Sequence, residues 1–192
     1  MSYLIAGLLI FLGVHAVRVL ADGWRTQMRQ RWGVALWRAL YSLLSLAGLA
    51  LLVWGFGQAR QTPQLLWIAP VGMRHLATTL TLPAFVLLAA AYVPGNRIKA
   101  RVHHPMTLGV AFWATAHLLA NGMLAHLVLF GSFLLWSLLV YGAARRRDAL
   151  NRPLHTEVRK GATGVTVAIG VAAWVAFALW LHGQLIGVRP FG

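Results

Sequence analysis

The sequence has no cysteine and only three carboxylates among its 192 residues. The lack of cysteine excludes disulfides, thiolate metal sites and cysteine nucleophiles. The carboxylates Asp22, Asp148 and Glu157 all fall in stretches that we expect to be hydrophilic connections. Chemistry in the apolar part of the chain therefore depends on imidazole, amide and hydroxyl groups.

Apolar residues make up 59% of the chain, and they come in continuous runs of about 15 to 22 residues, as membrane-spanning helices do. Backbone groups in lipid must be hydrogen-bonded internally, and continuous runs do not suit a β-barrel, which needs alternation. We expect an all-α fold, a polytopic membrane helical bundle forming a single transmembrane domain over residues 1–192. Six transmembrane helices are expected, at Tyr3–Leu20, Ala35–Phe56, Met73–Val93, Met106–Ala120, Met123–Gly142 and Ala162–Gly183.

Basic residues are distributed unevenly between the connections. All but three of the 17 lie in or beside the connections that follow the first, third and fifth predicted spans; the exceptions are Arg60, Arg74 and Arg189. The positive-inside rule then predicts a multi-pass membrane protein whose basic connections lie in the cytoplasm and whose two termini lie outside. We expect the basic connections to contact anionic membrane lipids. Nucleic acid is not an expected partner, because the run Arg145–Arg147 is too short to form a binding face.

Two of the eight histidines fall deep inside predicted spans, where a polar ring is costly to keep. His15 lies about 18 Å from the outer end of its span, and His117 lies about 14 Å from the outer surface of an apolar layer about 30 Å thick. Two imidazoles at one depth suit the axial ligands of a haem b iron. The alternative is that each ring hydrogen-bonds across the bundle in helix packing. For a haem ligand, the group that orients each ring should be a hydroxyl, an amide or a backbone carbonyl, because the apolar layer contains no carboxylate.

Three further histidines, His75, His126 and His182, fall near the outer ends of their predicted spans. They could bind copper or zinc, or they could anchor the helices at the membrane interface, and the sequence leaves this choice open. If haem is bound, Arg74 or His75 could hold its propionates at the outer surface.

Two other histidines carry weaker signals. His104 precedes Pro105, which suits the first turn of a helix, so its ring could turn inward toward the cofactor or cap the helix. His155 lies in a charged loop, where we expect it to be solvated.

Several ordered motifs make the chain resemble the NnrU family of bacterial membrane proteins, over nearly all of residues 1–190. The matching stretches are Gly13–Arg18, Trp37–Ser42, Met73–Leu76, Pro94–Lys99, His104–Met106, Trp113–Gly122 and Phe130–Phe133. The resemblance implies a role in nitrite and nitric oxide metabolism, and thus in denitrification. The family is also distantly similar to plant zeta-carotene isomerase, which uses a b-type haem held between histidines. The positions of those ligands resemble His15 and His117.

Three functions of different classes remain. The chain could be a haem b protein of nitrogen-oxide metabolism, or a haem-dependent cis–trans isomerase acting on a hydrophobic, carotenoid-like small molecule. It could instead be a non-enzymatic accessory factor that binds a respiratory reductase. A transporter is less well supported, because no charged residue lies in the apolar layer to couple ion movement.

Overall fold

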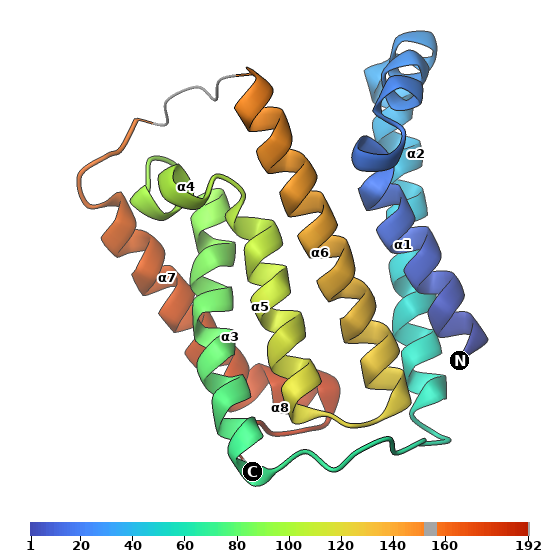
Figure 1. Cartoon of the computed structure of the whole chain (residues 1–192), viewed down its shortest axis with the longest axis vertical. Coiled ribbons are helices and arrows are strands. Elements are labelled where there is room, and N and C mark those ends of the chain that lie inside the picture. The colour runs from blue at the N-terminus through green and yellow to red at the C-terminus, as the bar shows by residue number, and fades with distance from the viewer. Residues whose placement is uncertain (152–156, 192) are drawn as a thin grey trace. The chain divides into compact units, whose positions relative to one another are not determined.

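The computed structural model describes residues 1–151 and 157–191, which leaves His155 outside the described residues. Within those ranges the regular structure is helical, with one isolated bridge between Leu65 and Met123. The all-α fold expected from the sequence is therefore confirmed. The elements are α1 (Ser2–Leu20), α2 (Asp22–Ala59), α3 (Val71–Tyr92), α4 (Arg97–Val102), α5 (Pro105–Ala120), α6 (Leu124–Asn151), α7 (Ala162–Ala176), the π-helical turn η1 (Phe177–Leu181) and α8 (His182–Ile186) (Figure 1).

Five helices of the described chain are long and apolar enough to cross a membrane. They are Ser2–Leu20, Asp22–Ala59, Val71–Tyr92, Leu124–Leu150 and Ala162–Ile186. The expected number of six is not confirmed, because α5 has only 16 residues. Its length is set at both ends: Pro105 begins the helix, and Asn121 leaves it in an extended conformation with φ −132° and ψ 122°.

Two carboxylates lie in helices, so the expectation that all three fall in connections was wrong. Asp22 is the first residue of α2, and Asp148 lies in α6, which continues past its expected end at Gly142. Alanine, leucine and arginine dominate this extension and have high helix propensity, so the helix continues where the apolar run stops. Glu157 does lie outside the helices.

The chain forms two compact units. The first unit comprises Met1–Trp67 and Met123–Trp136, and the second unit comprises Ile68–Gly122 and Ser137–Gly192. The expectation of one domain over residues 1–192 stays a prediction.

In the first unit, α1 and α2 pack side by side along a seam of small residues (Figure 1). A Cβ placed on Gly48 would lie 2.8 Å from the Phe11 backbone nitrogen, and one on Gly55 would overlap the Leu4 backbone nitrogen. Such close approach increases van der Waals contact, which drives helix association in lipid, where the hydrophobic effect contributes little.

In the second unit, α3 packs against both α5 and α7. Gly109 of α5 allows this approach, because a Cβ there would lie 3.0 Å from the Ala84 carbonyl oxygen. The fully buried Asn96 joins α3 to α4: its Nδ2 donates to the carbonyls of Ala90 and Val93, and its Oδ1 accepts from the Lys99 backbone N–H.

The α1–α2 seam can be tested with two glycines of α2. Gly55→Ala should lower the free energy of unfolding in detergent by about 1–3 kcal/mol, because its methyl group overpacks against α1. Gly57→Ala is the matched control, since nothing lies within 4 Å of a Cβ there. It should be neutral or slightly stabilising, as alanine favours a helix. If Gly55→Ala and Gly57→Ala unfold at the same denaturant concentration, the close approach of α1 and α2 at Gly55 is contradicted.

Candidate functional site

His15 lies on α1, and three aromatic rings surround its half-buried side chain. Its Nδ1 is 2.7 Å from the Phe11 carbonyl oxygen, one helical turn back. The Phe11 ring lies 4.4 Å from the imidazole by centroid, and Tyr41 and Trp136 lie at 5.4 and 6.3 Å. The Trp136 Nε1 is buried and has no hydrogen-bond partner among the described residues. A donor thus remains available close to His15.

His117 lies on α5 and has the same local arrangement as His15. Its Nδ1 is 2.8 Å from the Trp113 carbonyl oxygen, again one turn back. A carbonyl can only accept, so Nδ1 must carry the proton in both rings, and the lone pair of each neutral ring is on Nε2. Nε2 is a usual metal-ligating nitrogen of histidine. The expectation that backbone or other neutral groups orient both rings is confirmed.

His182 is a neighbour of His117 that the sequence did not reveal. The two rings are stacked, with centroids 6.4 Å apart and an interplanar angle of 24°. The Nδ1 of His182 is 2.6 Å from the Val188 carbonyl oxygen, so its lone pair is also on Nε2. His182 directly follows η1, a π-helical turn of a kind often found at functional sites.

The two predicted iron ligands belong to different units. His15 lies in the first unit, and His117 lies in the second together with Arg74, His75 and His104. A common haem between His15 and His117 therefore stays a prediction.

Arg74 and His75 are exposed in the first turn of α3, and a role in holding propionates stays a prediction. His104 has a definite partner, because its Nε2 lies 2.9 Å from Asp148 Oδ2. It occupies the N-cap of α5 without a side-chain capping bond, so the capping alternative is wrong. His103 also faces Asp148, at 3.4 Å, and has a positive φ of 62° that is uncommon for a residue other than glycine.

A metal site formed by His75, His126 and His182 finds no support in the structure. Within residues 1–151 and 157–191, no group of three or more His, Asp or Glu side chains is placed to hold a metal ion. His126 instead packs against Phe56 and Phe130, with ring centroids 5.2 and 6.0 Å away.

A break in α2 creates a pocket beside His15. Gly33 has φ 81° and ψ 159°, so α2 consists of two helical segments, residues 22–32 and 34–59. The first segment folds back, and the centroids of Trp24 and Trp37 are 5.9 Å apart. In a continuous helix these residues would be about 20 Å apart along the axis.

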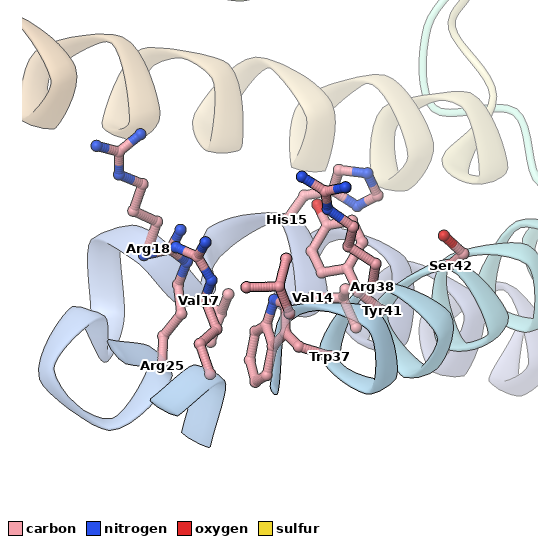
Figure 2. Close-up of a pocket in the computed structure, with 11 residues that line it drawn as sticks. Val14, His15, Val17, Arg18, Arg25, Trp37, Arg38, Tyr41 and Ser42 are labelled. Carbon is pink, nitrogen blue, oxygen red and sulfur yellow. The ribbon is translucent and has the colours of Figure 1, made fainter. Parts of the chain in front are cut away.

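We call the resulting cavity of 460 Å³ the arginine pocket. Its wall comprises Val14, His15, Val17, Arg18, Arg25, Arg29, Val34, Trp37, Arg38, Tyr41 and Ser42. Figure 2 shows the labelled Arg18, Arg25 and Arg38, which come from α1 and from both segments of α2. Four arginines therefore line a single cavity next to a histidine with a metal-ligating tautomer.

Sequence reasoning treated residues 22–32 as a basic connection and so missed the pocket. The signal was present, since Trp24, Met28 and Trp32 recur every four residues and mark one face of a helix. Arg25 and Arg29 are also one turn apart, on another face. Such a short segment with tryptophan and arginine on different faces is typical of a helix lying at a membrane interface.

The fold and the site thus define a helical membrane protein with backbone-oriented imidazoles in its apolar helices. The NnrU protein family model matches residues 3–190, and the chain belongs to this family. Comparison with curated proteins gives no match, and comparison with solved structures gives none either.

The break at Gly33 yields a test of the pocket's origin. These backbone angles are accessible essentially only to glycine. Gly33→Ala should therefore straighten α2 or lower the free energy of unfolding by about 1–3 kcal/mol. Because the chain lacks cysteine, spin labels at Gln27→Cys and Leu46→Cys report the bend directly. In Gly33→Ala, the distance between the two labels, measured by electron spin resonance, should lengthen toward about 28 Å, the value for a straight helix. Gly23→Ala, in the same segment, should leave the distance unchanged, and an unchanged distance and stability in Gly33→Ala would contradict the break.

Proposed function

We propose that this NnrU-family protein is an inner-membrane haem b protein whose axial ligands are His15 and His117. The observation that carries the proposal is the matching pair of Nδ1 contacts, 2.7 Å to Phe11 and 2.8 Å to Trp113. Each contact holds the ring in one tautomer and leaves the lone pair on the nitrogen that would bind iron. The absorption spectra described below separate this assignment from histidines that only pack helices together.

The surroundings of both rings suit haem. Phe11, Tyr41 and Trp136 around His15 and Trp113 beside His117 provide flat apolar surfaces like those that line cofactor sites. When bound, haem would supply an iron able to change oxidation state or bind a small molecule. The protein's part is to orient the imidazoles and exclude water. Neutral carbonyl partners leave the imidazoles less basic than carboxylate partners would, which favours reduced iron.

The proposed role is in nitrogen-oxide metabolism, to which the resemblance to the NnrU family connects the chain. Nitrite, nitric oxide and the reductases that act on them belong to denitrification. A haem able to exchange electrons or bind nitric oxide fits that setting. The accessory-factor alternative would hold if the purified protein contained no haem.

The proposed topology has six spans, with α5 as the short one, and both termini periplasmic. With 16 residues, α5 is about 24 Å long, a few ångströms short of a typical apolar layer. It packs along α3, a helix of spanning length, and small residues such as Gly109 and Ala114 face the interior. A short span can be accommodated by local thinning of the bilayer.

The axial ligands can be tested by absorption spectroscopy of the purified full-length protein. Wild type should show a Soret band and split α/β bands on reduction. His15→Ala and His117→Ala should each abolish or convert this spectrum, because one of two iron bonds is lost. His117→Met should give a different low-spin spectrum, since thioether replaces imidazole as the ligand.

Two controls make the spectroscopic result specific. His103→Ala removes a half-exposed ring next to Asp148 and should leave the bands unchanged. His182→Ala removes the neighbour stacked on His117 and should also retain bis-histidine bands. Loss of the bands in His182→Ala with retention in His117→Ala would assign the ligand to His182 instead. A haem-free wild type after haem-supplemented expression would contradict the proposal.

A reporter fused after Gly192 tests the topology. With six spans and a periplasmic N-terminus, alkaline phosphatase at the C-terminus should be active and green fluorescent protein should be dark. If α5 does not cross, the termini lie on opposite sides, and a fusion at either end reports this. A fluorescent C-terminal fusion would overturn the proposed topology.

A further inference from the structure

The arginine pocket carries positive charge that the chain does not neutralise. Asp22 pairs with Arg25 at 3.0 Å. For Arg18, Arg29 and Arg38, no ion pair with a carboxylate is found in the described parts of the chain. Arg25 and Arg29 are half-buried, so part of their hydration has already been removed. Four arginines in the wall of one cavity repel each other, and an anion bound among them would reduce that repulsion.

The rest of the wall indicates an anion with an apolar body. Val14, Val17 and Val34 line the same cavity as the arginines. Trp37 also lines it and contacts Trp24 and Trp32, with ring centroids 5.9 and 6.5 Å away. Tryptophan clustered with arginine is typical of the headgroup level of a membrane.

The number of arginines favours phosphate over carboxylate. Guanidinium groups form bidentate, charge-assisted hydrogen bonds with either anion. A phosphate monoester offers three terminal oxygens and up to two negative charges, so it can accept from several guanidinium groups at once. Tyr41 and Ser42 add hydroxyl donors to the same wall.

We propose that the arginine pocket binds the phosphate headgroup of an anionic phospholipid. Arg18, Arg25, Arg29 and Arg38 hold the phosphate, and the valines contact the start of the acyl chains. Basic pockets between membrane helices bind lipid headgroups of this chemistry. The site does not depend on haem, although His15 lies in its wall.

The test compares arginines of equal charge inside and outside the pocket. Dioleoyl phosphatidate is titrated into the full-length protein in neutral detergent, and binding is followed by native mass spectrometry. Arg29→Gln should raise the dissociation constant about tenfold, because one set of charge-assisted hydrogen bonds is lost. Arg31→Gln removes the same charge from the same helical segment but from outside the pocket wall, so it should change binding less than twofold.

Further measurements distinguish phosphatidate from three other ligands: a zwitterionic lipid, inorganic phosphate and the carboxylates of haem. Phosphatidylcholine, whose headgroup is zwitterionic, should bind at least tenfold more weakly than phosphatidate. If inorganic phosphate binds with equal affinity and competes with phosphatidate, the phosphate site stands but its ligand is soluble, which overturns the lipid assignment. If Arg29→Gln loses haem and binds phosphatidate normally, the pocket holds haem carboxylates, and the proposal is wrong. Equal weakening in Arg29→Gln and Arg31→Gln would reduce the effect to general charge attraction, and the proposal would be wrong in that case too.

A second variant covers the possibility that Arg29→Gln does not fold. Arg29→Lys keeps the charge and the long aliphatic stem but loses the planar fork. It should fold with a wild-type melting temperature and weaken phosphatidate binding about threefold or more. Wild-type phosphatidate affinity in Arg29→Lys together with Arg38→Lys would contradict bidentate binding in the pocket.

Discussion

A polar donor inside a bilayer must find its acceptor within the protein, because lipid offers none. This chain has only three carboxylates to offer. Backbone carbonyls act as acceptors for three of the histidines: those of Phe11, Trp113 and Val188 face the imidazoles of His15, His117 and His182. Outside the histidines, Asn96 and Lys99 bind the carbonyls at the end of α3 in the same way.

This dependence on carbonyls has a chemical consequence for the histidines. A carboxylate can pull the proton of an imidazole toward itself, whereas a carbonyl holds the proton on the ring without adding charge. For His15 and His117 the helix itself also sets the orientation, since the acceptor is one turn back on the same helix. These two rings are therefore oriented by local contacts, whereas His182 is oriented by Val188, beyond the end of α8. His104, by contrast, takes its orientation from Asp148 on a separate helix.

The elements that could be predicted are those that follow from local sequence. Long apolar runs predicted the apolar helices. The lack of carboxylates in these runs predicted that neutral groups orient the rings of His15 and His117. The end of α6 was missed because apolar content measures burial in lipid, whereas Asp148 lies in a stretch with high helix propensity. The fold-back of residues 22–32 depends on the backbone angles of Gly33, and the pocket depends on contacts between three segments. Neither follows from periodicity alone.

The π-helical turn before His182 has a consequence for how this region tolerates changes in length. A π-helical turn closes its hydrogen bonds over one more residue than an α-helical turn does, so η1 accommodates an extra residue within an otherwise regular helix. Removal of one residue between Phe177 and Leu181 would let α7 and α8 join as an uninterrupted α-helix. Because the π-turn takes up the extra residue, the helix beyond it would stay nearly in register, and His182 would keep its place beside His117. Removal of one residue from the regular part of α7 would instead turn the following helix by about 100°. The stacked pair should therefore survive the loss of one residue within Phe177–Leu181, whereas the same loss in α7 should separate the two rings.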